Sequence, residues 1–253
     1  MRVFISGASS GIGASLARHY ASGESAIGLA ARREDLLTVL AASLPGRASI
    51  YPLDVSNTGA LQAAAADFIG RYGPPDIVIA NAGISIGTSG EDIADTAKLE
   101  RVLVVNVVGM AATLSAFAPA MREAGHGTLV GISSVAGFRG LPGSGVYSAS
   151  KAAATAWLES LRVEVSGSGV SVVTICPGFI DTPMTRVNRY RMPFLISSED
   201  AARRFARAIA SKRRLAVIPW QMALVGTLLR ALPAWAYDRL VARAPRKPRD
   251  LPL

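Results

Sequence analysis

Short apolar runs alternate with helix-like segments along most of this chain, and that alternation limits the possible folds more than any other feature. The apolar runs occupy residues 2–7, 25–32, 48–55, 76–83, 127–137 and 169–178. Between them, apolar residues recur at the three- and four-residue spacing of helices. Runs that are apolar on both faces are typical of parallel strands with helices on both sides. With right-handed crossovers, the pattern predicts an α/β protein with a doubly wound parallel sheet.

The whole chain is expected to form one domain. Its 253 residues fit a single α/β unit, and no repeat or linker interrupts them. We place the sheet domain at residues 1–217 and a helical extension of the same domain at 218–253. The net charge is +9, and much of the excess lies in 203–214 and 242–249. No zinc-finger spacing or RNA-binding aromatic motif accompanies these residues, so we interpret them as a solvated face and expect no nucleic-acid partner.

Cysteine and histidine content argues against disulfides and metal centres. The single cysteine, Cys176, cannot form an intrachain disulfide, which favours a reducing compartment, and we interpret it as a buried apolar residue. His19 and His126 fall on a predicted helix and in a loop, so no metal site is expected. The N-terminal apolar run is too short for a signal peptide, and no membrane-spanning segment is expected. We therefore expect a cytoplasmic protein.

The segment SGASSGIG, residues 6–13, joins the first predicted strand to the first helix. Gly7, Gly11 and Gly13 permit a sharp turn, close approach of backbone amides to a pyrophosphate, and tight packing of helix on strand. The spacing differs from the common Gly-x-Gly-x-x-Gly fingerprint, and an ordinary glycine turn is the alternative. Because the segment follows an N-terminal strand and opens a helix, we favour a dinucleotide site.

The end of the second strand bears on which dinucleotide binds. A site for NAD would carry Asp or Glu there for the ribose hydroxyls, whereas this chain has Ala31 followed by Arg32 and Arg33. Guanidinium groups can bind a 2′-phosphate bidentately. The sequence therefore favours NADP(H) over NAD(H), with Arg32 the better placed arginine. The alternative is that both arginines are solvated residues at a helix start.

Six motifs occur together and in register: SGASSGIG at 6–13, NAG at 81–83, Asn106 within a helix, ISS at 132–134, YSASK at 147–151 and PGFIDT at 177–182. In this order and spacing, the chain resembles the classical short-chain dehydrogenases/reductases over about residues 1–215. The resemblance implies a Rossmann-type single domain, an NAD(P)(H) cofactor, and oxidation or reduction at a carbonyl or alcohol carbon.

Four residues form the predicted catalytic set: Asn106, Ser134, Tyr147 and Lys151. Hydride transfer to a ketone creates an alkoxide-like oxygen, which needs a proton donor and stabilising hydrogen bonds. Tyr147 can donate the proton, and Lys151, one helical turn later, can lower the pKa of that phenol and reach the cofactor ribose. Ser134 is expected to hydrogen-bond the substrate oxygen. Asn106 is expected to hold, through its main chain, a water linked to Lys151.

Each of these assignments has a simpler structural alternative. Tyr147 and Lys151 would also share a helix face if they only packed there. Ser133 competes with Ser134, but successive strand residues point to opposite faces, and the thirteen-residue spacing to Tyr147 favours Ser134. Asn106 could cap or bend its helix, although a buried amide among valines needs polar partners.

The residues expected to bind the cofactor are Gly7, Ser9, Ser10, Gly11, Ile12, Gly13, Arg32, Arg33, Asp54, Val55, Asn81, Ala82, Gly83, Tyr147, Lys151, Pro177, Gly178, Ile180 and Thr182. Asp54 would accept a hydrogen bond from the adenine amino group, and residues 81–83 would lie near the adenosine ribose. The resemblance implies that the Ile180 amide orients the nicotinamide carboxamide and that Thr182 contacts phosphate or carboxamide.

Residues 184–196, MTRVNRYRMPFLI, lie where the family places its mobile substrate lid, which we put at about 183–200. Four residues there are expected to line an apolar pocket: Met184, Tyr190, Met192 and Phe194. Three arginines either meet an acidic substrate group or solvate the loop: Arg186, Arg189 and Arg191. The favoured substrate is a hydrophobic ketone or secondary alcohol.

Residues 218–249 depart from the compact family pattern. The stretch is apolar but broken by Arg230 and Pro233, so it is too short and interrupted to span a bilayer. Its aromatic residues beside arginines fit an amphipathic segment at a membrane surface. A helix pair that covers the substrate pocket or contacts another subunit fits as well and is slightly favoured.

The sequence as a whole predicts an NADP(H)-preferring oxidoreductase, a carbonyl reductase acting on a hydrophobic small molecule, in a dimer or tetramer. One alternative is a related enzyme that uses the Tyr/Lys pair for epimerisation, which usually requires a larger C-terminal domain. Another is a cofactor-binding regulatory or scaffold protein of the same fold. A chain without Tyr147, Ser134 or Lys151 would favour this regulatory role, but all three residues are present.

Overall fold

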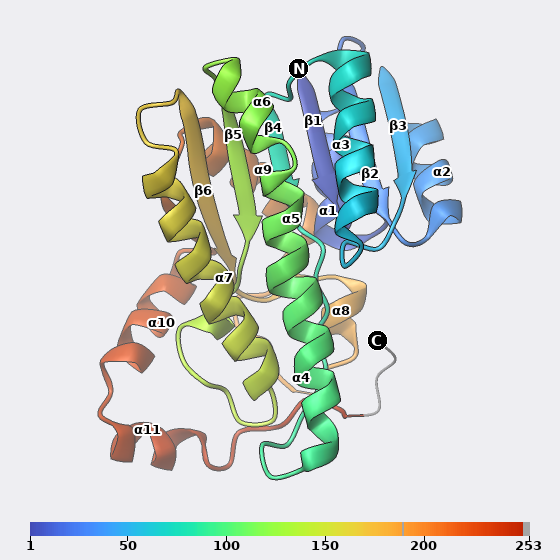
Figure 1. Ribbon diagram of the computed structural model, residues 1–253. Coiled ribbons are helices and arrows are strands. Elements are labelled where there is room, and N and C mark those ends of the chain that lie inside the picture. Colours follow the sequence, from blue (N-terminus) through green and yellow to red (C-terminus); the bar gives the residue numbers. More distant parts are fainter. Residues whose placement is uncertain (189, 250–253) are drawn as a thin grey trace.

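A seven-stranded parallel sheet forms the centre of the computed structural model, which describes residues 1–188 and 190–249. Its order is β3-β2-β1-β4-β5-β6-β9 (Figure 1). The strands are β1 (Arg2–Ser6), β2 (Ala26–Ala31), β3 (Arg47–Pro52), β4 (Ile77–Ala80), β5 (Gly127–Ile132), β6 (Val170–Pro177) and β9 (Leu215–Ile218). The predicted single-domain, doubly wound α/β fold is therefore confirmed. The predictions for Arg189 and for residues 250–253 of the extension fall outside the described residues.

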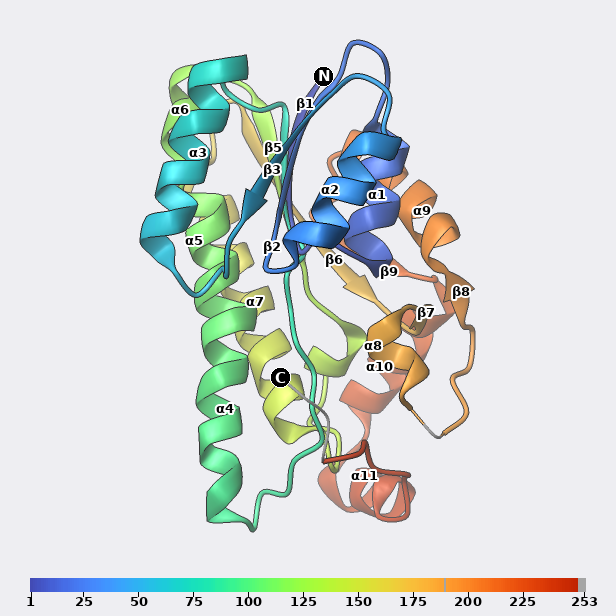
Figure 2. The same cartoon turned by 90° about the vertical axis from the view of Figure 1, so that its right-hand side faces the viewer.

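Helices cover both faces of the sheet (Figure 2). One face carries α1 (Gly11–Tyr20), α2 (Glu34–Ser43) and α9 (Ser198–Ala210). The other carries α3 (Thr58–Tyr72), α4 (Thr96–Leu103), η2 (Val104–Val108), α5 (Gly109–Ser115), α6 (Ala118–Glu123) and α7 (Gly145–Glu164). Three short helical turns and a small second sheet complete this part of the chain: η1 (Ile93–Asp95), η3 (Val135–Gly137), α8 (Pro183–Arg186), and β7 (Ile180–Asp181) paired with β8 (Ile196–Ser197).

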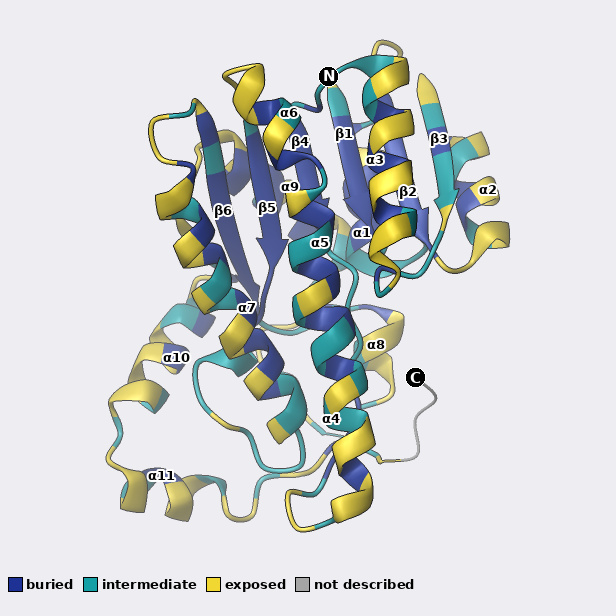
Figure 3. Ribbon diagram, in the orientation of Figure 1, coloured by how far each residue is buried: buried dark blue, intermediate teal, exposed yellow. Residues whose placement is uncertain are grey.

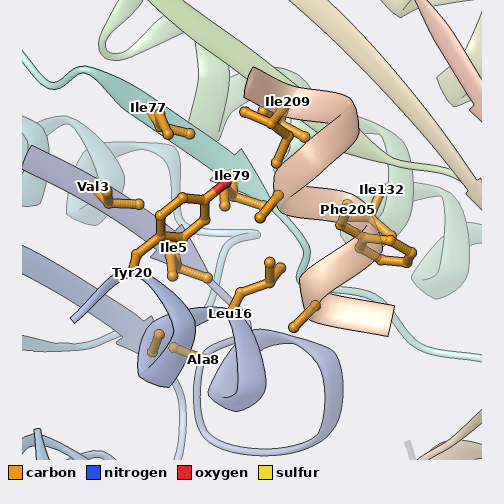
Figure 4. Packing of buried hydrophobic residues seen from close by; sticks show 14 of the residues in the cluster. Val3, Ile5, Ala8, Leu16, Tyr20, Ile77, Ile79, Ile132, Phe205 and Ile209 are labelled. Atoms are coloured by element: carbon orange, nitrogen blue, oxygen red, sulfur yellow. The ribbon is translucent and has the colours of Figure 1, made fainter. Parts of the chain in front are cut away.

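Each face of the sheet has its own apolar core, because successive strand side chains point to opposite faces. On the α1 side, Val3 and Ile5 of β1 belong to a cluster with Leu16 of α1 (Figure 4). Between them in sequence, Phe4 points the other way and meets Phe68 and Phe117, with ring centroids 5.7 and 4.6 Å apart. The strands are thus buried on both faces, which explains why their sequences do not alternate with polar residues.

The order of the strands reverses at β1, which has β2 on one side and β4 on the other. In doubly wound sheets, ligands bind in the crevice outside the carboxyl ends of the strands at such a reversal. The sequence motifs of interest follow the carboxyl ends of β1, β2, β3, β4, β5 and β6. The fold therefore gathers them along one edge.

One helical stretch, Ile93–Glu123, is long and apolar enough to cross a membrane by length and composition. Half of its most apolar 18-residue window is buried within the protein. Met110, Leu114 and Phe117 lie in the core against the sheet. This stretch is the central helix of the α3 side of the fold, and its apolarity is explained by that packing.

The chain continues beyond α9 into β9, α10 (Gln221–Ala231) and α11 (Ala234–Val241). Strand β9, with the sequence LAVI, pairs in parallel with β6 at the sheet edge and was not predicted. The two helices lie away from the sheet, below the ends of β6 and α7 in Figure 1. The predicted helical extension is thus present as a helix pair.

Candidate active site

A cleft along the carboxyl ends of the strands gathers nearly all the predicted site residues. It runs from Arg32 and Arg33 at one end, past the glycine segment, to Ser134, Tyr147 and Lys151 at the other. Two predicted residues do not line it: Gly13 lies behind the glycine turn and Asn106 is fully buried. The cleft wall also contains residues that the sequence analysis missed, among them Leu53, Ile84 and Val105. Ile84 directly follows the NAG motif, and this position in the sequence could have identified it as a residue of the cleft wall.

The glycine segment leaves no room for side chains. Gly7 has φ +69°, and a Cβ added there would lie 2.7 Å from Cα of Ala82. A Cβ on Gly13 would lie 2.2 Å from the carbonyl oxygen of Gly7. The Asn81 side chain donates to the carbonyls of Ser6 and Gly7, at 3.2 and 3.1 Å, and so ties β4 to the turn. The turn is a backbone cradle at a helix N-terminus, which suits a pyrophosphate.

Two arginines stand at the β2 end of the cleft. Nη2 of Arg33 donates to the hydroxyls of Ser9 and Ser10, both at 2.8 Å, so this guanidinium lies against the glycine segment. Arg32 lies on the other side, with Nη1 3.9 Å from Asp54 Oδ2. Sequence position favoured Arg32, but the contacts place Arg33 closer to the phosphate cradle. Together the two cations make this end of the cleft suited to an additional phosphate.

Asp54, after β3, is held in place by its neighbours. Oδ1 accepts hydrogen bonds from the Ser56 amide and hydroxyl at 2.9 and 2.8 Å, and Oδ2 accepts one from Arg101 at 2.9 Å. The pKa of Asp54 is lowered, since these bonds outweigh the effect of burial. An ionised carboxylate is thus fixed at the place where an adenine amino group was expected to donate.

Tyr147 and Lys151 lie on α7 and face the opposite end of the cleft. Nζ of Lys151 is 5.7 Å from the centre of the Tyr147 ring. Burial raises the pKa of Tyr147 to about 12, and the adjacent Ser134 hydroxyl opposes this shift. The expected lowering of this pKa by Lys151 is not seen, because desolvation of the phenol disfavours the phenolate.

Lys151 is a buried ammonium group without a carboxylate nearby among the described residues. Nζ donates to the carbonyl oxygen of Ile132 at 2.8 Å. Burial lowers its pKa to about 8. Gly83, whose added Cβ would lie 3.6 Å from this nitrogen, leaves open space beside it. A buried cation with unused N–H donors facing a cleft indicates a functional group.

The two serines at the end of β5 have different surroundings. Oγ of Ser133 is engaged by α7, where it donates to the Lys151 carbonyl at 2.9 Å and lies 2.7 Å from the Thr155 hydroxyl. Oγ of Ser134 accepts from the Ala136 amide and lies 3.4 Å from the Pro177 carbonyl. Ser134 is the serine whose hydroxyl stands beside Tyr147.

Asn106 lies in η2, a π-helical turn inside the long α4–α5 helix, and it is completely buried. Its side chain is fully used: Oδ1 accepts from the Ile84 amide at 2.8 Å, and Nδ2 donates to the Ile84 carbonyl and to Ser150. The side chain therefore fixes the chain that follows the NAG motif. A π-turn displaces carbonyls from the regular helical ladder and is frequent at functional sites, which leaves the main chain as the part of Asn106 suited to bind water.

The segment after β6 closes the cleft from the far side. Thr182 caps α8, and its side chain lies opposite the glycine turn: a Cβ on Gly11 would lie 3.1 Å from Thr182 Cγ2. Pro177, Gly178 and Ile180 form the adjoining wall. Cys176, just before them, is fully buried, as expected of a small apolar residue.

The lid residues do not all line the pocket as predicted. Met184 lines the cleft, and Tyr190 packs against Phe179 and is close enough to Tyr147 to raise the pKa of that phenol. The Met192 sulfur accepts a hydrogen bond from the Asn188 side chain. The prediction for Phe194 is wrong: this residue has φ +58° and exposes 48% of its surface, because the loop turns its ring toward solvent.

The C-terminal extension contacts the substrate side of the cleft. Arg139, in the loop before α7, donates to the carbonyls of Leu229 and Leu232 at the end of α10, and its guanidinium stacks 4.2 Å from the Tyr237 ring. The last described residues cross to the loop after β4, where Lys247 donates to Ser85 at 2.9 Å. Arg249 forms ion pairs with Asp92 and Asp95. The helix pair is thus attached to this end of the molecule, and the expectations that it covers the substrate pocket, contacts another subunit or binds a membrane surface stay predictions.

No group of three or more His, Cys, Asp and Glu side chains that could hold a metal ion occurs among residues 1–188 and 190–249. The cleft holds a phenol, an ammonium and hydroxyls at one end, and guanidinium groups, a carboxylate and the backbone amides of the glycine turn at the other.

Comparison with known proteins relates this site to a family. The model of the short chain dehydrogenase family matches residues 1–192. An uncharacterised oxidoreductase of Myxococcus xanthus is 37% identical over 242 residues, which cover 94% of this chain and 95% of that protein.

Two solved structures share the fold. A short-chain dehydrogenase from Streptomyces avermitilis superposes with a TM-score of 0.80 at 26% identity, covering 96% of this chain and 97% of the other. A 3-oxoacyl-[acyl-carrier protein] reductase with bound NAD from Brucella melitensis gives a TM-score of 0.75 at 28% identity, with 86% and 88% of the chains covered.

Proposed function

Because the chain belongs to the short-chain dehydrogenase/reductase family and is an oxidoreductase, we propose that it interconverts a hydrophobic ketone and a secondary alcohol with a preference for NADP(H). The observation that carries this proposal is the cleft itself. It joins a backbone phosphate cradle flanked by two arginines to a half-buried Tyr147 and to the buried Lys151 and Ser134. Epimerisation and a purely regulatory role have no separate support from the contacts.

The residues present fit a phosphorylated dinucleotide. Gly7, Gly11 and the amides that open α1 suit the pyrophosphate, and Arg33 with Ser9 and Ser10 suits a 2′-phosphate. Asp54 suits the adenine, and the open space beside Lys151 suits a ribose hydroxyl. When bound, the nicotinamide cofactor supplies the hydride for reduction or accepts it for oxidation. The preference for NADP(H) rests on Ala31 and Arg32, which stand where an NAD site would carry a carboxylate at the end of β2, and on these arginine contacts.

Tyr147 is the proton donor in this proposal. With its pKa raised to about 12, the phenol keeps its proton near neutral pH and is ready to protonate a developing alkoxide. Ser134, beside the phenol, would donate a hydrogen bond to the same substrate oxygen. Both groups lie at fixed positions on α7 and at the end of β5, so little reorganisation is required.

Lys151 and Asn106 would resupply the proton. The pKa of Lys151, about 8, lies near working pH, so its ammonium can exchange a proton without a large barrier. Asn106 holds the neighbouring chain through its side chain and leaves main-chain carbonyls of the π-turn for a water. This route would lead from Tyr147 to solvent without exposing the phenol.

The substrate side of the cleft favours an apolar molecule. Met184 of the lid lines the cleft, and Tyr190 lies close to Tyr147. The oxoacyl reductase among the similar structures makes acyl ketones a reasonable first choice, together with alkyl, aryl and steroid ketones.

The test is a screen of NADPH and NADH oxidation across these four ketone classes with the wild type and Arg33→Ala. We expect turnover with NADPH on at least one class, and a loss of about tenfold or more in NADPH affinity for Arg33→Ala with little change for NADH. Arg32→Ala should show a smaller effect of the same kind, and Arg122→Ala, on α6, should show none. Equal use of both cofactors by the wild type would contradict the preference, and absence of turnover on all classes would contradict the activity.

A further inference from the structure

The helix pair at the C-terminal end has an apolar side turned away from the protein. Trp220, Leu224, Leu228, Trp235 and Leu240 each expose between 63% and 68% of their surface. The first three are spaced by four residues: Trp220 immediately precedes α10, and Leu224 and Leu228 lie within it. They therefore share one helix face. We call these five residues the outer apolar face. Figure 3 shows α10 and α11 as largely exposed, beyond the edge of the packed core.

The orientation of this face is fixed by the other side of the helices. Met222 packs on Gly178, where an added Cβ would lie 2.6 Å from its Cγ, and Gly226 packs on Phe138, with a corresponding distance of 2.4 Å to the ring. Arg139 holds the carbonyl end of α10, and the Tyr237 hydroxyl donates to the Gly140 carbonyl. Because both helices are anchored, the outer apolar face cannot turn inward, and its exposure is a property of the folded chain.

Among the other exposed apolar residues, four in the lid segment expose only 37% to 48% of their surface: Met184, Val187, Phe194 and Leu195. Several others are scattered. Val39, Ile93 and Val163 lie on three different elements and form no common surface. Single exposed apolar residues are normal on soluble surfaces. A group of five, including two tryptophans, on two consecutive helices calls for a partner.

The charges on and next to the two helices indicate what that partner is. Residues 218–249 contain six basic residues and one acidic residue, Asp238. Arg230, Arg239 and Arg243 are exposed and form no ion pair with the described residues. In a two-fold contact between copies of this face, the arginines of both copies would be brought together, which opposes association. An anionic surface would instead be attracted to them.

We propose that the outer apolar face docks on the surface of an anionic lipid bilayer. Trp220 and Trp235 would lie at the headgroup level, where tryptophan is favoured, with the leucines below them and the arginines beside lipid phosphates. The inference goes beyond the oxidoreductase activity and does not depend on it. Its consequence is spatial: the inner side of α10 contacts Phe138 and Gly178, and Gly178 lines the cleft.

The test is co-sedimentation of the full chain with vesicles of mixed phosphatidylglycerol and phosphatidylcholine, compared with phosphatidylcholine alone. The wild type should bind the anionic vesicles and be released by high salt. The variant Trp220→Ser/Leu228→Ser/Trp235→Ser should lose about tenfold or more of its partition coefficient. The matched control, Val39→Ser/Ile93→Ser/Val163→Ser, should bind like the wild type. Equal binding by the two triple variants, or no binding by the wild type, overturns the proposal.

A second measurement uses the wild-type fold alone. Trp157, on α7, is the third tryptophan of the chain and lies away from the outer apolar face. In the wild type and in Trp157→Phe, brominated lipid should quench most tryptophan fluorescence, whereas the residual Trp157 signal of Trp220→Phe/Trp235→Phe should resist quenching. A different result is expected if the face is a subunit interface: sedimentation equilibrium without lipid would then show a smaller particle for the serine variant than for the wild type, and the lipid proposal would be wrong.

Discussion

The two ends of the cleft are built in different ways. The cofactor end is made by backbone: glycines at 7 and 13 let β1, α1 and β4 approach within distances that no side chain would allow, and Gly11 faces Thr182 across the cleft. The substrate end is held together by side-chain contacts between residues far apart in the sequence. Arg139 contacts the end of α10, and Lys247 contacts Ser85. The glycines of the first end therefore tolerate almost no substitution. The residues that make these contacts at the second end can be replaced without altering the groups that carry out the chemistry.

Replacement of Tyr147 by Phe should have the largest effect on activity and should leave the cofactor end unaffected. The phenol proton is lost while the ring and the phosphate cradle remain, so kcat/KM for ketone reduction should fall by about 10²-fold or more. The dissociation constant of NADPH, measured by fluorescence titration, should stay within about twofold. Tyr51→Phe, on β3, is the control. Substantial remaining turnover would remove Tyr147 from the role of donor.

Gly13→Ala should damage the cofactor end itself. The new methyl group would meet the Gly7 carbonyl, 2.2 Å from its ideal position, and overpacking of this kind costs about 1–3 kcal/mol. The free energy of unfolding in urea and the affinity for NADPH should both fall. Gly70→Ala, on α3, has no atom within 4 Å of its added Cβ, and it should be neutral or stabilising by up to about 1 kcal/mol. If both variants behave alike, the close approach is not required.

Arg139→Ala should disturb only the substrate end. The loop before α7 would lose its hydrogen bonds to α10 and its stacking on Tyr237, so KM for the ketone should rise by about tenfold while NADPH affinity is unchanged. Proteolysis near α10 should become faster. Arg162→Ala, whose exposed partner is Glu159 on the same helix, should leave both measurements unchanged. A loss of NADPH affinity would show that the two ends are not independent.

Lys247, in the segment attached to the substrate end, should make the stability of the folded chain depend on pH. Burial lowers the pKa of Lys247 from 10.5 to about 8. Between these values the unfolded chain binds a proton that the folded chain does not, so stability rises with pH in that window, and below it the buried charge opposes folding.

The variant Lys247→Met removes this dependence. The difference in Tm, variant minus wild type, should become more negative by about 2–4 °C between roughly pH 7.5 and pH 9.5. The similar contribution of Lys151, whose pKa is also about 8, is common to both proteins and cancels. A constant difference in Tm would show that Lys247 keeps an ordinary pKa.

Much of the cofactor end and of the fold could be predicted from the sequence, because short-range rules govern them. Continuous apolar runs identified six strands, and the glycine turn marked the phosphate cradle. Strand β9 was missed because its four residues, Leu215–Ile218, lie between a basic run and Pro219 and are too few to show a clear periodicity. Their pairing depends on the exposed edge of β6, which is a property of the folded sheet.

The details of the catalytic set were less predictable. The motif spacing identified Tyr147 and Lys151, but the raised pKa of the phenol comes from desolvation by the surrounding fold. Sequence position favoured Arg32 over Arg33, whereas the direction of each side chain was set by Asp54 on one side and the Ser9 and Ser10 hydroxyls on the other. Phe194 was apolar and near the lid, yet a positive φ turned it outward.

The sequence by itself determined the parallel sheet, the glycine turn and the presence of a phenol, an ammonium and hydroxyls at the strand ends. These features depend on backbone freedom and on residue spacing, which are local properties. Only the tertiary structure decided which side of α10 faces the protein, how Lys247 and Arg249 reach the loops after β4, and how strongly Tyr147 is desolvated. Those properties depend on atoms that are distant in sequence and become neighbours only when the chain has folded.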